Sequence, residues 1–417
     1  MSSFSMVSSR HAVRSVVVAC AAAAAALVGS SAWAQNTSPV VLSFSTVGDS
    51  RQDPITFDTA SVGATLSGQD AIWLQSTKAM TRIVRTIQAQ KSSMLFFNGD
   101  MIHGYGKAAF GYTSNLASSS IAGPTAPASV VDIVNSDIMK FYRQYAFWRG
   151  VMAPVMETGT YVFPVAGNHE TQCKACGKVA QVENENAWAA NMGDLVVDTA
   201  RFTGILGSAP QNVSYGPATT GTSPDGLTTD QSKLTYSFDF KGTHFAVINT
   251  DPVGADSRAP TQWLNADFAA ASARGVKRFF VFGHKPAYTY QYSATSTTPF
   301  GGLDASPGSI AARDAFWSVI ENYNATYFAG HEHIYNISQP KGGAYQVVVG
   351  SGGSPFDAKA TDVTKNPATD RTYAWATVRV HQDGSVDILG YGFDANFGPT
   401  RLIQQIALPA TGAGIAP

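Results

Sequence analysis

Charged side chains are scarce in this chain. Of its 417 residues, 14% are Asp, Glu, Lys or Arg, and the formal net charge is −1, whereas roughly a quarter of the residues in typical soluble proteins are charged. A basic surface of the kind that binds nucleic acid or anionic membranes is therefore not indicated. Hydrophobic residues make up 44%, which is ample for a core, and the length allows one large domain or two ordinary ones.

Long hydrophobic runs are absent except near the N-terminus. The apolar stretch from Val16 to Val28 is too short to span a bilayer; Arg10 and Arg14 precede it and Ala32-Trp33-Ala34 follows it. This arrangement is typical of a secretory signal peptide, although a buried N-terminal helix is the alternative. We predict that residues 1–34 are removed on export to the periplasm or the medium. Residues 35–417 are then expected to form a single domain with no transmembrane segment.

Cysteine is almost absent as well. Outside the predicted signal peptide the chain has only Cys173 and Cys176, in the spacing Cys-Lys-Ala-Cys. In an oxidising compartment this spacing favours a small disulfide-closed loop. A zinc site or a thioredoxin-like redox centre is the alternative, but a redox motif is expected to open a helix after a strand. We predict a disulfide that stiffens the segment behind His169.

The chain lacks a Gly-x-Ser-x-Gly motif, so nothing points to a serine nucleophile. It has instead five short clusters of metal-binding residue types, each directly after an apolar run typical of a buried strand. The clusters are Gly48-Asp49-Ser50-Arg51, Asn98-Gly99-Asp100, Gly167-Asn168-His169-Glu170, Gly283-His284 and Gly330-His331-Glu332-His333. Ligand sites of α/β sheets form just past the carboxyl ends of the strands, so these side chains can converge although they are distant in sequence.

Strand-like and helix-like segments alternate without an internal repeat or a domain linker, which favours a layered α/β architecture. A hairpin is predicted around Lys241-Gly242-Thr243. Three stretches, residues 104–129, 193–232 and 288–308, lack periodicity, and we expect the first and third to wall a substrate pocket. The other predicted strands are Val40 to Val47, Met94 to Phe97, Tyr161 to Val165, Phe279 to Phe282, Ala325 to Phe328, Tyr345 to Val349, Trp375 to Val380 and Val386 to Tyr391.

The residue types in the clusters indicate a particular kind of metal. Carboxylate, amide and imidazole ligands together suit Zn, Mn, Fe, Co or Ni better than Ca or Mg. A carboxylate between two such ions can bridge them, and two metals ~3.5–4 Å apart can clamp a phosphoryl group and generate a hydroxide near neutral pH. The sequence therefore predicts metal-assisted hydrolysis.

On these motifs, above all Asn168-His169-Glu170 and His331-Glu332-His333, the chain resembles the calcineurin-like metallophosphoesterases, which include the purple acid phosphatases. The resemblance extends from Asp49 through Gly352-Gly353. It implies an α/β fold, a four-layer sandwich of two mixed β-sheets flanked by helices. It also implies two transition metal ions, divalent or of mixed valence. One would be held by Asp49, Asp100 and His333, and the other by Asp100, Asn168, His284 and His331, with Asp100 as the bridge.

The resemblance implies roles for two further residues. Metal-bound hydroxide would be the nucleophile, and His169 would contact a phosphate oxygen or protonate the leaving alkoxide, a role typically worth ~10²–10⁴-fold. Glu170 is expected to orient His169. We therefore expect an exported phosphoesterase acting on small-molecule phosphomonoesters. The alternatives are a phosphodiesterase of cyclic nucleotides or lipid head groups and, in another class, a non-catalytic phosphate-binding protein on the same fold.

The first cluster departs from the family pattern. Most members carry Asp-x-His there, and purple acid phosphatases carry Asp-x-Gly together with a Tyr three residues after the bridging Asp. This chain has Arg51 and His103 at those two positions. Arginine has no free lone pair, so we hypothesise that His103 completes the shell of the first metal and that Arg51 binds the substrate phosphate bidentately. In the alternative, Arg51 pairs with Asp53, His103 belongs to the following loop, and the first metal is weakly held.

Overall fold

The protein is described from a computed structural model. The structure describes residues 36–54, 68–109, 130–217, 223–290, 301–304, 307–357 and 371–411. The predicted signal peptide, residues 1–34, lies outside these ranges. The chain divides into two compact units, Met1–Pro39 and Val40–Pro417, and the second contains every helix and strand given below. Within the described ranges no helix has both the length and the apolar character that a membrane span requires.

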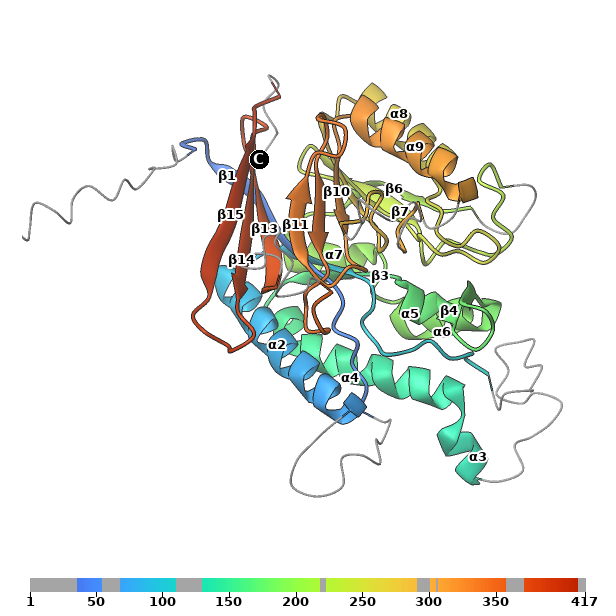
Figure 1. The fold of residues 1–417 in the computed structure, drawn as a ribbon. Coiled ribbons are helices and arrows are strands. Elements are labelled where there is room, and N and C mark those ends of the chain that lie inside the picture. The colour runs from blue at the N-terminus through green and yellow to red at the C-terminus, as the bar shows by residue number, and fades with distance from the viewer. Residues whose placement is uncertain are drawn as a thin grey trace, which may run out of the picture. The chain divides into compact units, whose positions relative to one another are not determined.

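Two large mixed β-sheets form the centre of the second unit (Figure 1). In the first sheet the order is β15-β14-β13-β1-β2-β3, and in the second it is β11-β12-β10-β9-β8-β7-β6. The first sheet consists of β1 (Val40–Val47), β2 (Met94–Asn98), β3 (Tyr161–Val165), β13 (Tyr373–His381), β14 (Val386–Phe393) and β15 (Arg401–Leu408). The second consists of β6 (Gln211–Tyr215), β7 (Tyr236–Phe240), β8 (Thr243–Val247), β9 (Arg278–Phe282), β10 (Thr326–Ala329), β11 (Tyr335–Ser338) and β12 (Gln346–Val349).

Strand direction divides each sheet into a parallel and an antiparallel part. The first sheet is parallel across β1, β2 and β3, and the second across β8, β9, β10 and β12. The remaining pairs are antiparallel. Parallel neighbours place their carboxyl ends at the same edge of a sheet, which is where the five clusters begin. A separate small ladder pairs β4 (Gln172–Cys173) with β5 (Val179–Ala180).

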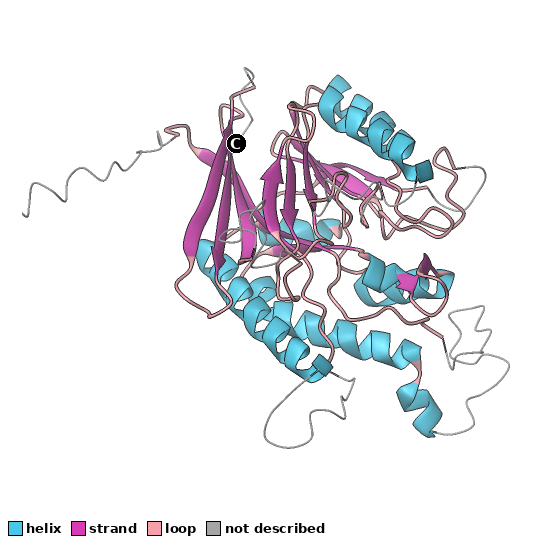
Figure 2. Ribbon diagram, viewed as in Figure 1, coloured by secondary structure: helices cyan, strands magenta, loops and turns pink. Residues whose placement is uncertain are grey.

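Helices cover the outer faces of both sheets (Figures 1 and 2). Residues of α2 and α4 share one hydrophobic cluster with the first sheet, and residues of α8 and α9 share another with the second. The structure therefore has four layers, and the predicted fold is confirmed. The helices are α2 (Gly68–Gln90), α3 (Val130–Asn135), α4 (Asp137–Glu157), α5 (Asn168–Thr171), α6 (Val182–Met192), α7 (Thr199–Leu206), α8 (Thr261–Ala273) and α9 (Pro307–Asn322).

The two sheets pack on each other through aromatic side chains. Phe44 of β1 is fully buried and makes edge-on contacts with several phenylalanines of both sheets. Phe96 of β2 stacks on Phe282 of β9 with ring centroids 3.7 Å apart. Such rings bury large apolar areas, so the facing surfaces are held together and the strand ends that carry the clusters keep a fixed relation. On the other side of the first sheet, α2 contributes a buried stripe at helical spacing, Met80, Ile83, Val84 and Ile87.

Candidate metal centre

Five of the predicted metal ligands follow the carboxyl ends of parallel strands. They are Asp49 after β1, Asp100 after β2, Asn168 after β3, His284 after β9 and His331 after β10. Three of them, Asp49, Asp100 and His331, have left-handed φ values of 64°, 51° and 70°, which is uncommon outside glycine and concentrates at functional sites. The chain segments approach so closely that a Cβ at Gly330 would collide with Asp49 Oδ2.

Asp100, Asn168, His284 and His331 bring their donor atoms together, and we call them the four-donor cluster. Asn168 Oδ1 lies 2.9 Å from both His284 Nε2 and His331 Nδ1. His284 Nε2 lies 3.1 Å from Asp100 Oδ1. The other ring nitrogen of His284 donates to the backbone carbonyl of Asn98 over 2.8 Å, a contact that fixes the tautomer and leaves the Nε2 lone pair facing the cluster.

The electrostatics of this cluster call for a cation. Burial disfavours the protonated form of His284, but Asp100 and Asp49 outweigh it and raise the pKa of His284 to about 9. Burial and the neighbouring His284 hold the pKa of His331 well below its usual range. The two rings are nearly perpendicular, with an interplanar angle of 80°, and His331 Nδ1 lies only 3.2 Å from His284 Nε2, so both nitrogens cannot carry a proton there. A metal ion would satisfy all four donors at once.

Asp49, Asp100 and His333 form a second group, the three-donor cluster, whose ligand atoms lie within 4.8 Å of one another. His333 Nδ1 donates to the carbonyl of Pro355 over 2.7 Å. Its Nε2 is buried, has no hydrogen-bond partner among the described residues and lies 3.7 Å from Asp49 Oδ1. Burial, helped by Arg51, lowers the pKa of His333 to about 4. An unpaired buried lone pair is costly, and a metal ion at this position would use it.

Arg51 lies against the shared carboxylate of the two clusters. Its Nε and Nη2 are each 3.4 Å from Asp100 Oδ2. The backbone holds it there, with a left-handed φ of 41° and an N–H that donates to the Asp100 carbonyl over 2.8 Å. The guanidinium is partly exposed. Arg51 therefore pairs with Asp100 instead of the Asp53 of the alternative prediction.

His103 does not join either cluster, contrary to our hypothesis. Its Nδ1 lies 3.1 Å from Asp53 Oδ2, and the described groups of converging metal-ligand atoms do not include it. Asp53 is buried and also accepts a hydrogen bond from Gln144 Nε2 over 2.9 Å. Because His103 Nδ1 pairs with Asp53, that nitrogen is not available in this conformation to replace the ligand that the resemblance implies for the first metal.

His169 lies beside the clusters without being part of them. Its Nδ1 donates to the backbone carbonyl of His103, and its Nε2 lies 3.6 Å from Asp100 Oδ2. The side chain is buried, and burial, with Arg51 adding to it, holds the pKa of His169 well below its usual range despite the attraction of Asp100. His169 Nε2 and the Arg51 guanidinium thus face the same oxygen of Asp100.

Glu170 has a different role from the predicted one. Its carboxylate accepts four backbone N–H groups and no bond from the His169 ring; the donors are Asp100, Met101, Ile102 and Gly167 at 2.7–3.2 Å. Burial, with the nearby Asp100, raises the pKa of Glu170 to about 7. Glu170 therefore fastens the loop after β2 to the loop after β3 and positions Asp100 itself.

Tyr105 is a site residue that the sequence did not reveal. Its hydroxyl accepts a hydrogen bond from Asn168 Nδ2 over 2.8 Å, which turns the amide oxygen of Asn168 toward the four-donor cluster. Its ring lies 4.0 Å from the ring of His169, centroid to centroid. Burial, with the negative charge of Asp100, raises the pKa of Tyr105 to about 12. No motif marks this tyrosine, because its place depends on the path of the loop after Asp100.

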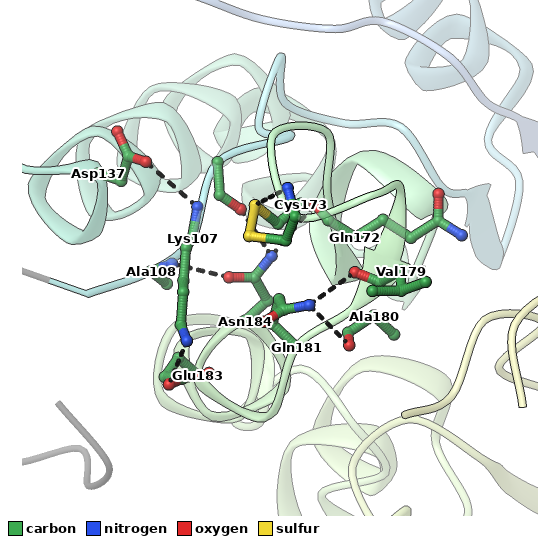
Figure 3. The surroundings of a disulfide bond; sticks show 12 residues. Lys107, Ala108, Asp137, Gln172, Cys173, Val179, Ala180, Gln181, Glu183 and Asn184 are labelled. Carbon is green, nitrogen blue, oxygen red and sulfur yellow. Dashed lines mark hydrogen bonds and ion pairs between the residues drawn. A yellow bond between two sulfur atoms is a disulfide. The ribbon is translucent and has the colours of Figure 1, made fainter. Parts of the chain in front are cut away.

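The predicted disulfide between Cys173 and Cys176 is present. It closes a short loop at the β4–β5 ladder, where Cys173 pairs with Val179 (Figure 3). The backbone N–H of Lys174 in this loop donates to the carbonyl of Tyr105 over 2.9 Å, and the N–H of Tyr105 donates to the carbonyl of His169 over 2.9 Å. The disulfide loop is therefore hydrogen-bonded to Tyr105, which in turn is hydrogen-bonded to His169; that it stiffens this segment stays a prediction.

Two cavities bear on where a substrate could bind. One of about 360 Å³ is lined by His103, Gly104, Tyr105 and Gly106, so the described part of the first predicted pocket wall does border a cavity. Residues 110–129 and most of the third stretch lie outside the described ranges. A larger cavity of about 800 Å³ lies at the amino ends of β1, β2 and β3 and touches none of the candidate ligands. Cavity size therefore does not locate this site; donor chemistry does.

Both clusters fit transition metal ions, because each presents nitrogen and oxygen donors together and one of them has an otherwise unpaired buried imidazole nitrogen. Asp100 belongs to both, as the resemblance implied for a bridging ligand. The candidate site is thus assembled from all the predicted ligands except His103. The identity and number of the metals stay predictions.

Comparisons with known proteins support the fold. No protein-family model and no curated protein sequence matches the chain. Among solved structures, a purple acid phosphatase from yellow lupin (Lupinus luteus) is similar with a TM-score of 0.50 and 14% identity over 89% of this chain, which spans 54% of that protein. A dimetal phosphatase from Danio rerio has a TM-score of 0.40 and 12% identity, covering 89% of this chain and 100% of that one. A 5'-nucleotidase from Candida albicans has a TM-score of 0.37 and 12% identity, covering 87% and 54%. The similarity to the lupin protein shows that the chain shares the fold of that purple acid phosphatase.

Proposed function

We propose that this protein hydrolyses phosphate esters with two transition metal ions, and that its substrates are small phosphomonoesters. The observation that carries the proposal is the pair of donor clusters that share Asp100, with Arg51 and His169 both beside the shared carboxylate. Metal ions held by these clusters would polarise a phosphoryl oxygen and lower the pKa of a bound water. A protein that only binds phosphate has little need for this constellation.

The residues of the chain then have distinct tasks. Arg51 offers two N–H groups to the phosphate, and its partial exposure lets it exchange the long 3.4 Å contacts with Asp100 for shorter ones to the substrate. His169, with Nδ1 fixed on a backbone carbonyl, presents Nε2 to a phosphate oxygen or to the leaving oxygen. Glu170 keeps Asp100 in place through the backbone, and Tyr105 keeps the amide of Asn168 turned toward the metal.

The direct test is metal-dependent hydrolysis. Protein stripped with a chelator and reloaded with Mn²⁺, Zn²⁺, Fe²⁺ or Ni²⁺ is assayed in parallel on p-nitrophenyl phosphate and bis(p-nitrophenyl) phosphate. We expect hydrolysis of the monoester only after reloading, and at least about tenfold slower hydrolysis of the diester. Faster diester cleavage would make the protein a phosphodiesterase. No hydrolysis of either ester with any metal would contradict the proposal and favour a binding protein.

The task of His169 can be tested with the leaving group. In His169→Asn, hydrolysis of an alkyl ester such as glycerol 3-phosphate is expected to fall by about 10²–10⁴-fold, the usual contribution of a general acid. The loss should be much smaller on p-nitrophenyl phosphate, whose leaving phenolate needs little protonation. Equal losses on both esters would mean that His169 binds the phosphate and does not protonate the leaving oxygen.

We further propose that the protein is exported. The proposal is supported by the basic, apolar and small-residue pattern of residues 1–34 and by the disulfide between Cys173 and Cys176, which persists in oxidising compartments. Amino-terminal sequencing of the protein from the cell exterior or periplasm is expected to begin at Gln35. A protein recovered in the cytoplasm with Met1 intact would contradict it.

A further inference from the structure

The cavity of about 360 Å³ is lined by two residues that contact His169, although no member of the two donor clusters lines it. The ring of Tyr105 lies 4.0 Å from the ring of His169, and the backbone carbonyl of His103 accepts a hydrogen bond from His169 Nδ1. A phosphate held between Arg51 and the metals would have its leaving oxygen near His169. The rest of the leaving group would then extend into this cavity, which is large enough for a three-carbon unit or a sugar.

The charges that line the cavity are not balanced. Asp137 is occupied, since its carboxylate pairs with Lys140 over 3.3 Å and accepts the backbone N–H of Lys107 over 3.2 Å. Lys174, another cation of the lining, is exposed, and its ammonium group has no ion pair or hydrogen bond among the described residues. Burial lowers the pKa of His103, and the positive charges of Arg51 and Lys174 add to this effect. Within the described residues, the lining therefore carries one cation without a counterion.

The backbone around Lys174 is fixed. The disulfide between Cys173 and Cys176 closes the loop on both sides of it, and its N–H donates to the carbonyl of Tyr105 over 2.9 Å. Figure 3 shows the neighbouring braces: Lys107 links Asp137 to Glu183, and Asn184 accepts the N–H of Ala108. A charge on a braced loop is preorganised, so less ordering entropy is lost when it meets a ligand.

His103 supplies a second polar group to the same wall. Its Nδ1 is engaged by the buried carboxylate of Asp53, which is itself held by Gln144. Gln144 also accepts the backbone N–H of Gly104 over 2.9 Å. The ring of His103 is therefore anchored on one side, and its other nitrogen, Nε2, is the atom that can meet a hydroxyl or an acid oxygen of a leaving group.

We propose that this cavity is a leaving-group subsite for esters that carry a second anionic group, either a carboxylate or another phosphate. Lys174 would hold this group, with His103 beside it. The proposal rests on the proposed phosphoesterase activity. The preferred substrates are then acidic phosphomonoesters, such as phosphorylated hydroxy acids or bisphosphates of small polyols. Neutral alkyl phosphates would react at the same centre but bind less tightly.

Matched esters test the subsite. Metal-loaded protein is assayed on glycerol 3-phosphate, on 3-phosphoglycerate, which has a carboxylate in place of the terminal alcohol, and on 1,3-propanediol bisphosphate. We expect a lower KM for one or both acidic esters, and the two arms tell which acid the subsite prefers. Lys174→Ala is expected to raise the KM for the preferred acidic ester about fivefold, the effect of losing one exposed ion pair, with kcat and the KM for glycerol 3-phosphate unchanged.

Two variants complete the experiment. Lys174→Arg keeps the charge and should restore the low KM, whereas Lys178→Ala, which removes a lysine of the same segment outside the cavity lining, should have no effect. Equal KM values for all three esters would contradict the proposed subsite. An equal increase in the KM values for the neutral and the acidic esters in Lys174→Ala would contradict it as well. Failure to hydrolyse any ester, p-nitrophenyl phosphate included, would instead overturn the proposed function.

Discussion

The two halves of the candidate metal centre, the four-donor and the three-donor cluster, share Asp100 but differ in donors and in charge. In the four-donor cluster the Asn168 amide oxygen and the two imidazole nitrogens lie 2.9–3.2 Å apart, and Asp100 Oδ1 lies 3.1 Å from His284 Nε2. The three-donor cluster has one imidazole, and Arg51 lies 3.4 Å from the other oxygen of Asp100, Oδ2. Fewer ligands and a nearby positive charge both weaken the binding of a cation. We therefore expect one tightly held and one weakly held metal.

The largest effect is expected from the residue that the halves share. Asp100→Asn removes the bridging charge from both clusters, so each metal should bind at least about 100-fold more weakly, and the purified variant should contain almost none. Metal analysis after dialysis measures this. Asp230→Asn, an exposed carboxylate far from the site in sequence, is the control and should keep the wild-type content. Retention of one full equivalent in Asp100→Asn would show that the halves are independent.

The next pair of variants separates the halves. His331→Ala removes an imidazole from the four-donor cluster only, and His333→Ala removes one from the three-donor cluster only. We expect His331→Ala to lose the tightly bound metal and His333→Ala to keep it while losing the weakly bound one. Metal titrations of the two stripped variants give the remaining affinities. If both variants kept the same affinity, the assignment of ligands to halves would be wrong.

Arg51 is expected to cause part of the difference in metal affinity between the four-donor and the three-donor cluster. Arg51→Gln removes the charge beside Asp100, so the weaker metal should bind about tenfold more tightly, while the KM for a phosphomonoester rises because the phosphate loses its guanidinium partner. Arg51→Lys keeps the charge and should leave the metal affinity nearly unchanged. An Arg51→Gln variant with unchanged metal affinity would mean that ligand number alone sets the difference.

The smallest effect is expected at His103. The ring of His103 bonds to Asp53 and not to either cluster. The backbone carbonyl of His103 contacts His169 and is kept when the side chain is truncated. His103→Ala should therefore hold both metals within about twofold of the wild-type affinities. The same dialysis and metal analysis applies. A variant that loses the weaker metal would restore our original hypothesis that His103 is a ligand.

The sequence predicted the buried strands better than the exposed ones. The central strand β1 and the fully buried edge strand β3 begin and end where predicted. The hairpin of β7 and β8 turns at Lys241-Gly242, both with positive φ. The short pair β4 and β5 was not predicted, and in the two large sheets the strands that were not predicted are the edge strands β6, β11 and β15. Their side chains are partly exposed, so they lack the continuous apolar run by which a strand buried on both faces is recognised.

The candidate ligands could be predicted because each cluster follows a buried strand that is recognisable by its apolar run. The residues that support the candidate ligands could not be predicted in this way. Glu170 bonds to four backbone N–H groups, and Tyr105 orients Asn168 from a loop. His103 turns toward Asp53 although its offset from Asp100 suggested a ligand. These contacts depend on residues in the left-handed conformation, such as Asp100 and Tyr105, which have φ values of 51° and 63°. The residue pattern does not predict these φ values.

The unequal halves can be tested most directly by calorimetric titration of the stripped wild-type protein with Mn²⁺ or Zn²⁺. The account predicts two binding steps with a total of two ions per chain, the first tighter than the second by about tenfold or more. It also predicts that only the second step strengthens when inorganic phosphate is present to neutralise Arg51. Two ions bound with equal affinity, or no binding to the folded protein, would contradict it.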